Sequence, residues 1–277
     1  MSNPAVVVDT LRVPDASLHY EVRGRGPLVV LVGAPMDAGA FEGLAELLAV
    51  DHTVLTTDPR GINRSSVDFP DRDSTPEMRA DDLARLIREV DAGAAVVFGS
   101  SGGAVSALAL AQGYPELVRV VIAHEPPLVE LLPDREELRA GTDEIIALHA
   151  AGDVVGAWRK FLAQANISMP EEVFQMMFAG ERSEQQVADD RFQHEHMMVP
   201  TVAFEPDVEG LRAGAVRVVV GIGEESGGQI CDRTSRALAG VLGVEPTFFP
   251  GDHIGFVGDA GAFEVRLREV LAAVVVG

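Results

Sequence analysis

The chain contains very little cysteine. Cys231 is the only one among 277 residues, so no disulfide can form within the chain, and nothing indicates an oxidising compartment. A single cysteine in a folded domain is typically a small, unreactive residue of the interior. We therefore predict no chemical role for Cys231.

Positive charge is scarce as well. The chain has 22 lysines and arginines against 43 acidic residues, which gives a formal net charge of -21. This excess of negative charge repels nucleic-acid phosphates and anionic membrane surfaces. The sequence therefore excludes both as partners, favours a small molecule and leaves a homodimer open.

Long apolar runs are missing too. The first residues, MSNPAVVVDTLRVPD, lack the basic segment and the apolar segment of a signal peptide. No run reaches the roughly 20 apolar residues that a transmembrane helix needs. We also find no internal repeat and no low-complexity linker, so we expect a soluble, cytoplasmic protein.

Short β-rich runs alternate with helix-like segments along the chain. Runs such as VRVVIAH are continuously β-branched or apolar, which is typical of strands covered on both faces. Strands are expected at residues 17–22, 27–33, 52–58, 94–99, 118–124, 216–223 and 245–251. Helices are expected at residues 74–90, with Ser74 or Thr75 as the cap, 231–242 and 260–275. The alternation predicts an α/β fold with a mainly parallel sheet.

The strand pattern is interrupted between residues 128 and 210. Helix-like stretches such as REELRAGTDEIIALHAAG replace it, separated by proline and glycine. We predict a core domain from residues 1–127 and 211–277 and a helical cap from residues 128–210. Flexible thioethers and aromatic rings suit an adaptable apolar pocket. The residues predicted to contact substrate are Met36 in the core and Trp158, Met176 and Met197 in the cap.

The stretch VVFGSSGGAVSAL joins a strand-like run to a helix-like run. Within it, only Ser101 has glycine at both minus two (Gly99) and plus two (Gly103), which is the G-x-S-x-G spacing. A strand that turns sharply into a helix holds this serine in a strained conformation, so its neighbours must lack side-chain bulk. The spacing predicts that Ser101 is a nucleophile and that Ser100 is structural.

Four segments together resemble the α/β-hydrolase family. LVGAP resembles its oxyanion loop, DPRGINRSS its turn after the fourth strand, GYPELVRVVIAHEPP the segment after the nucleophile helix, and FFPGDHIGF its histidine loop. The departures are Val32 where a histidine is usual and Asn63 where glycine is usual. Asparagine tolerates a left-handed backbone better than most residues. The resemblance implies a mainly parallel eight-stranded sheet, helices on both faces and a cap after strand 6.

The resemblance also implies acyl transfer without a cofactor. Ser101 would attack an ester or lactone carbonyl, His253 would carry the proton, and the N–H groups of Gly102 and Ala34 would bind the oxyanion. The other histidines are expected to have solvated or packing roles. In particular, the i, i+2 spacing of His194 and His196 points two helical rings apart, so we expect no metal site there.

The acid of the triad is open between two places. Most family members carry it after the seventh strand, where this chain offers Glu224 and Glu225. The alternative is Glu125, at the end of the run 118–124, which corresponds to the sixth strand of the family. We prefer Glu125 because lactone hydrolases of the zearalenone type carry a glutamate there, in a similar His-Glu-x-Pro segment. The predicted function is therefore a serine esterase or lactonase with an apolar substrate. The alternatives are a ligand receptor with little turnover, or a serine-type C–C hydrolase or perhydrolase.

Overall fold

A central sheet organises the molecule, which is described here from a computed structural model covering residues 6–275. The strand order is β1-β2-β4-β3-β6-β7-β8-β9, with β5 paired to β2. Six neighbouring strands of the sheet run parallel to one another, namely β4, β3, β6, β7, β8 and β9. Strand β2 is antiparallel to β1, β4 and β5. The strands are β1 (Val7–Val13), β2 (Ala16–Arg23), β3 (Leu28–Val32), β4 (Thr53–Thr57), β5 (Ser66–Val67), β6 (Ala95–Ser100), β7 (Val118–His124), β8 (Arg217–Gly223) and β9 (Thr247–Phe249).

The sheet confirms the predicted α/β class and adds two strands to those expected from local pattern. Strand β1 lies at the edge of the sheet, where most of its residues are exposed and give no alternating apolar signal. Strand β5 has only two residues and brings the described sheet to nine strands, one more than the resemblance implies.

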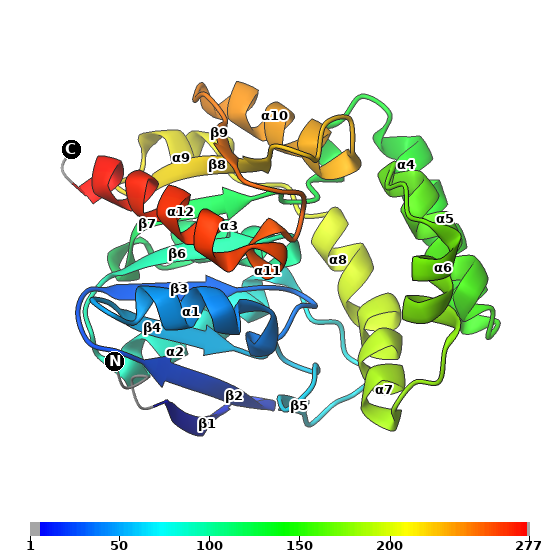
Figure 1. Cartoon of the computed structure of the whole chain (residues 1–277), viewed down its shortest axis with the longest axis horizontal. Coiled ribbons are helices and arrows are strands. Elements are labelled where there is room, and N and C mark those ends of the chain that lie inside the picture. The colour runs from blue at the N-terminus through cyan, green and yellow to red at the C-terminus, as the bar shows by residue number, and fades with distance from the viewer. Residues whose placement is uncertain (1–5, 276–277) are drawn as a thin grey trace.

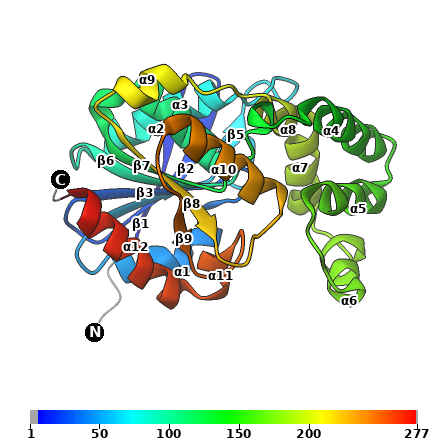
Figure 2. The ribbon, with the colours of Figure 1, turned by 90° about the horizontal axis from the view of Figure 1, so that it is seen from above.

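Helices cover both faces of the sheet. Viewed from above, α2, α3 and α9 lie on one side, and α1, α11 and α12 lie on the other (Figure 2). These flanking helices are α1 (Glu42–Leu48), α2 (Pro76–Val90), α3 (Gly102–Gly113), α9 (Val208–Ala213), α10 (Ile230–Leu242), α11 (Gly255–Gly258) and α12 (Ala260–Val275). The α2 N-terminus shows why the sequence starts a helix there: Thr75 accepts a hydrogen bond from Met78 N–H, and Pro76 occupies the first turn.

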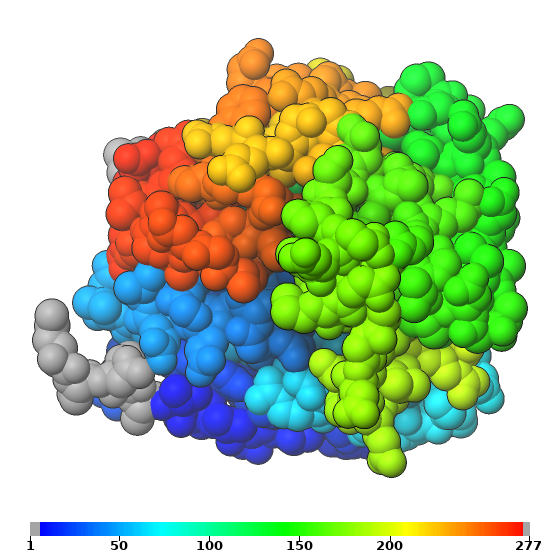
Figure 3. All heavy atoms as spheres, turned by 45° about the vertical axis from the view of Figure 1, so that its right-hand side comes forward, coloured from blue at the N-terminus to red at the C-terminus, as the bar shows by residue number. Residues whose placement is uncertain are grey.

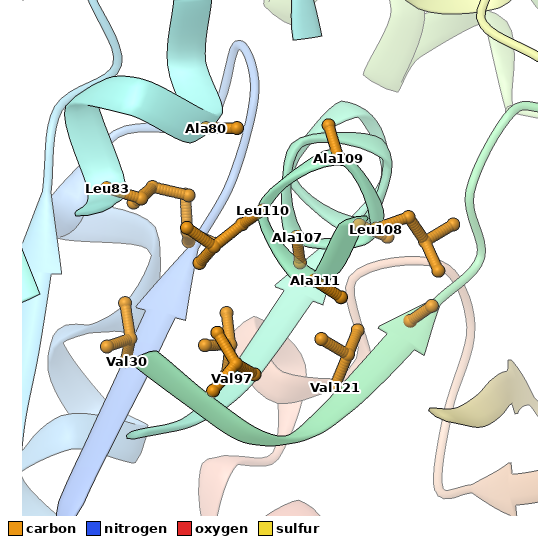
Figure 4. Packing of buried hydrophobic residues seen from close by; sticks show 14 of the residues in the cluster. Val30, Ala80, Leu83, Val97, Ala107, Leu108, Ala109, Leu110, Ala111 and Val121 are labelled. Carbon is orange, nitrogen blue, oxygen red and sulfur yellow. The ribbon is translucent and has the colours of Figure 1, made fainter. Parts of the chain in front are cut away.

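The two layers of helices bury two separate apolar clusters against the sheet. Because successive side chains of a strand point to opposite faces, Val97 packs toward α2 and α3, while Val96 and Phe98 pack toward α1 and α12. Figure 4 shows part of the first cluster, in which Leu110 of α3 lies over Val97 and Leu108 of α3 lies over Val121. This packing on both faces explains the continuous apolar runs in the central strands.

The segment between β7 and β8 is helical, and all of it except α9 stands beyond the end of the sheet (Figure 1). We refer to residues 128–210 as the cap. Figure 3 shows its green and yellow-green atoms lying against the core. Its main elements are α4 (Arg135–Ala150), α5 (Val154–Ala165), α6 (Glu171–Phe174), the π-helix η4 (Gln175–Ala179), α7 (Glu184–Phe192), the π-helix η5 (Gln193–Met197) and α8 (Met198–Val202).

Candidate active site

Ser101 lies at a sharp turn between β6 and α3. Its backbone has φ +57° and ψ -129°, a left-handed conformation that is strained for a residue with a side chain. A Cβ on Gly99 would lie 2.5 Å from Gly103 O, and a Cβ on Gly103 would lie 2.2 Å from Val32 O. Both flanking glycines are therefore required by close backbone approach, as the spacing predicts.

The two serines of the turn have different surroundings. Ser101 lines a cavity at the end of the sheet. Ser100 is fully buried, and its Oγ lies 3.1 Å from His124 Nδ1. Four phenylalanine rings enclose His124, and burial lowers the pKa of its imidazole to about 4, so this histidine is neutral at pH 7.

Glu125 follows the last residue of β7, where its own backbone has φ +52°. Its carboxylate is fully buried, and each oxygen accepts one hydrogen bond: Oε1 from Gly223 N–H at 2.7 Å, and Oε2 from His253 Nδ1 at 2.6 Å. Burial alone would raise the pKa of Glu125, but the hydrogen bond and charge of His253 outweigh it, and the pKa falls to about 2. Glu125 is therefore an anion at neutral pH.

The alternative acids lie elsewhere. Glu224 and Glu225 are exposed on the loop after β8, and neither side chain has a bond to His253 in the described part of the chain. Of the three candidates, the structure brings only Glu125 to the histidine.

His253 lies in the loop after β9, with its side chain about one quarter exposed. Burial alone would lower the pKa of His253, but the adjacent Cys231 thiol, when ionised, and the Glu125 carboxylate favour the imidazolium. The pKa is therefore raised well above its usual 6.5. Ser101 lines the same cavity, but within residues 6–275 no hydrogen bond joins its Oγ to His253. In this part of the chain, His253 is thus hydrogen-bonded to Glu125 and not to Ser101. Hydrogen bonds between a catalytic base and a nucleophile often form only in the complex with substrate.

The two predicted oxyanion donors lie next to each other. Gly102 is the first residue of α3, where a helix leaves its N–H groups without internal partners. Ala34 approaches so closely that a Cβ on Gly102 would lie 2.5 Å from Ala34 O. The Ala34 N–H makes no hydrogen bond within the described residues, and both residues line the cavity.

Hydrogen bonds between polar residues hold the loop that follows Ala34. The buried Asp58 accepts a hydrogen bond from Ala38 N–H at 2.9 Å, and Arg64 binds the same carboxylate. Asn63 has φ +49°, the left-handed conformation expected where this chain replaces a glycine. Its amide donates to Asp37, which caps the helical turn at residues 38–41.

The cavity itself is mostly apolar and lies between the core and the cap. It encloses about 970 Å³ of space between the protein atoms, part of it open to solvent. The cap contributes residues from α4, α5, η5 and α8, and Figure 1 shows α8 between the sheet and the outer cap helices. Apart from the residues already named, the wall includes Pro35, Pro127, Val129, Thr142, Ile145, Phe161, Gln164, Ala165, Ile167, Gln193, Met197, Met198, Thr201, Val202, Gln229, Ile230 and Cys231.

The four predicted substrate contacts divide unevenly. Met197 is buried in the wall of the cavity. Met176 is 74% exposed, Trp158 stacks on Phe178 away from the wall, and Met36 packs against the phenylalanine core. Of these four residues, only Met197 lines the cavity. The composition of a segment does not show on which side of it each residue lies.

Two groups of side chains in residues 6–275 bring three potential metal ligands together: Glu125 with Cys231 and His253, and His149 with Asp190 and His194. In the first, Glu125 already binds His253. In the second, Arg182 binds Asp190, and the histidine rings stack at 4.1 Å and 6°, so their in-plane lone pairs do not converge on one point.

Comparisons with known proteins show the family to which the chain belongs. A family model described as the alpha/beta hydrolase fold matches residues 26–163. The "uncharacterized hydrolase YraK" of Bacillus subtilis is 32% identical over 275 residues, covering 95% of each chain. The chain belongs to the alpha/beta hydrolase fold family.

Two further similarities place this alpha/beta hydrolase among its relatives. The "zearalenone hydrolase" of Cladophialophora bantiana is 34% identical over 113 residues, which cover 39% of this chain and 43% of that protein. The solved structure titled "Est816 as an N-Acyl homoserine lactone degrading enzyme" superposes with a TM-score of 0.72 at 20% identity, over 94% of this chain and 99% of that chain. At that identity the superposition shows the fold alone.

No helix between residues 6 and 275 has the length and apolar character needed to span a membrane.

Proposed function

We propose that this alpha/beta hydrolase is a cofactor-independent serine hydrolase that cleaves a carboxylic ester or lactone of an apolar small molecule. The observation that carries the proposal is the buried Glu125 carboxylate, 2.6 Å from Nδ1 of His253, which lines a cavity together with the strained Ser101. A carboxylate in this position fixes the tautomer of the imidazole and leaves Nε2 to accept a proton.

In the proposed reaction, Ser101 Oγ attacks the carbonyl carbon while His253 Nε2 removes the hydroxyl proton. The tetrahedral oxyanion binds the N–H groups of Gly102 and Ala34. When the oxyanion collapses, the alkoxide leaves with the proton from the imidazolium, and an acyl-enzyme remains. Water, deprotonated by His253, then attacks the acyl carbon and regenerates Ser101. Glu125 remains ionised throughout and stabilises the imidazolium.

The apolar cavity wall favours a substrate with an apolar acyl group. The printed names of one relative and one structural neighbour refer to zearalenone hydrolysis and to the degradation of an acyl homoserine lactone. These names support the inclusion of lactones with open-chain esters. In a lactone the leaving alkoxide stays attached to the acyl chain, so the cavity must hold the whole ring-opened product until water attacks.

A panel of acyl esters and lactones tests this function. We expect multiple turnovers on apolar members of the panel, higher kcat/KM for bulky apolar acyl groups than for acetate, and no turnover with Ser101→Ala. A single turnover followed by a stable acyl-enzyme would favour a receptor. Absence of ester and lactone cleavage, together with cleavage of a C–C bond or perhydrolysis, would replace the proposal with those reactions.

A further inference from the structure

Cys231 lies in the wall of the same cavity as Ser101. It is the second residue of α10, is partly exposed and faces the space between the core and the cap. Its Sγ lies within 4.8 Å of a ring nitrogen of His253 and of a carboxylate oxygen of Glu125. The thiol therefore lies both at a cavity and beside His253, a position that the sequence does not predict.

Two features of this position assist attack by the thiol, which reacts as its thiolate. An imidazole that Glu125 stabilises as a cation lies beside the sulfur. The thiol also lies in the first turn of a 13-residue helix, where the helix dipole favours negative charge. The neighbouring acid Asp232 is bound to Arg236 and to Gly228 N–H, which offsets its repulsion.

The cavity thus offers two nucleophiles of different character to one Glu125–His253 pair. The Ser101 hydroxyl has the N–H groups of Gly102 and Ala34 beside it, which suit attack on a carbonyl carbon. A thiolate is soft and polarizable, and it reacts readily at the β-carbon of a conjugated carbonyl compound without an oxyanion hole. The apolar wall selects small apolar compounds of this kind over charged ones.

We propose that Cys231 is a site of covalent modification by small apolar α,β-unsaturated carbonyl compounds. His253 accepts the thiol proton, and Sγ bonds to the β-carbon as the carbon–carbon π bond breaks. The electron pair of that bond goes to the α-carbon, which then takes the proton from the imidazolium. The product is a thioether, with no atom lost and no oxidant or reductant consumed.

The modified sulfur occupies the cavity beside His253 and blocks access to Ser101. Loss of hydrolysis on modification rests on the proposed function, whereas the alkylation itself does not. The two can therefore be tested separately, by mass and by turnover.

N-ethylmaleimide, a small apolar conjugated imide, is the probe. Intact mass of the full chain should show one adduct, which maps to Cys231 because it is the only thiol. We expect the native protein to react about tenfold or more faster than His253→Asn, since an unassisted thiol has only a few per cent thiolate at pH 7. Ser101→Ala should react at the native rate, and Cys231→Ser should form no adduct.

The matched control is His52→Asn, which removes a histidine remote from the cavity and should leave the alkylation rate unchanged. If His253→Asn does not fold, as judged by circular dichroism, His253→Gln or Glu125→Gln takes its place and should also react slowly. Equal rates for the native protein and a folded His253 or Glu125 variant would overturn the proposal. Where esters are hydrolysed, activity should fall in proportion to the adduct, while Cys231→Ser keeps its own untreated activity. Full activity of the alkylated native protein would overturn the expected blocking of Ser101.

Discussion

A buried carboxylate binds a histidine both beside the cavity in the core and in the cap. In the core, Glu125 binds His253 at 2.6 Å, beside a strained serine and an open cavity. In the cap, Asp190 lies 3.0 Å from His149 Nε2 and also accepts hydrogen bonds from Trp158 and Arg182. The pairs have similar chemistry but different neighbours.

The difference lies in what remains free after each pair has formed. The His253 ring, which Glu125 binds through Nδ1, lines a cavity whose wall also contains the Ser101 hydroxyl and the Cys231 thiol. Within residues 6–275 the Asp190 side chain binds His149, Trp158 and Arg182, and no serine or cysteine. His149 stacks on His194, and burial lowers the pKa of His194. The buried His149 Nδ1 and His194 Nε2 have no partner within the described residues. We therefore expect the core pair, and not the cap pair, to take part in catalysis.

The largest effect on turnover is expected from Ser101→Ala. Loss of the nucleophile should reduce kcat by at least about 10⁴-fold, and by as much as about 10⁶-fold on the scale of serine proteases. Ser100→Ala is the matched control and should retain most activity, because Ser100 binds His124 away from the cavity. Steady-state kinetics on the best ester of the panel would decide. Comparable losses in both variants would mean that the turn is structural.

Glu125→Gln should have the next largest effect. The amide can stabilise the wrong tautomer of His253, so kcat should fall by about 10⁴-fold at near-wild-type KM, as in the corresponding protease variant. Glu224→Gln and Glu225→Gln should stay near wild type, since both side chains are exposed. If either of those two loses most activity while Glu125→Gln retains it, the acid lies after β8.

The pH dependence of the rate tests the role of the Glu125–His253 pair. General-base catalysis requires neutral His253, and Glu125 raises the pKa of this histidine. The wild-type rate should therefore increase with pH through a value well above 6.5. In Glu125→Gln that rise should shift to lower pH, because the charge favouring the imidazolium is gone. A rise at the same pH in both proteins would contradict the coupling.

The cavity wall predicts a smaller effect on specificity. Met197→Ala removes a buried side chain from the wall and should lower kcat/KM for bulky apolar acyl groups by about tenfold relative to acetate. Met176→Ala, at an exposed methionine of the cap, should leave this ratio unchanged. Equal ratios in all three proteins would place substrate selection elsewhere.

Asp190→Asn should have the smallest effect on turnover and a clear effect on stability. It removes the charge that holds Arg182 and the two cap histidines, so the free energy of unfolding should fall by about 1.5–3 kcal/mol. Denaturant unfolding and kcat measured on the same preparation would separate the two effects. A large loss of kcat without loss of stability would make this cluster part of the catalytic machinery.

The sequence predicts those parts of the molecule that depend on local requirements. The glycines around Ser101 are needed by the turn itself, and the β-branched runs by strands covered on both faces. The position of Glu125 came from the resemblance, and its contact with His253 agrees with that preference. No feature of local pattern predicts β1, whose exposed edge position weakens its apolar signal.

Other features depend on segments that meet only in the folded chain. Cys231 approaches His253 because α10 begins where the loop after β9 passes, and no spacing in the sequence encodes that meeting. The HEH pattern led us to compare His194 with His196. In the structure His194 instead stacks on His149, 45 positions earlier in the numbering, and His196 lies near Asp73. Tertiary packing, rather than helical spacing, selects these partners.

The rate and position of labelling by a fluorophosphonate test the central claim most directly, because the reagent reacts with a serine only when a general base activates it. We predict a single adduct on Ser101, labelling that is slower by orders of magnitude in Glu125→Gln, and an unchanged rate in Asp190→Asn. An adduct on Ser100, or equal slowing in the core and cap variants, would contradict the assignment of Ser101, His253 and Glu125 as one catalytic unit.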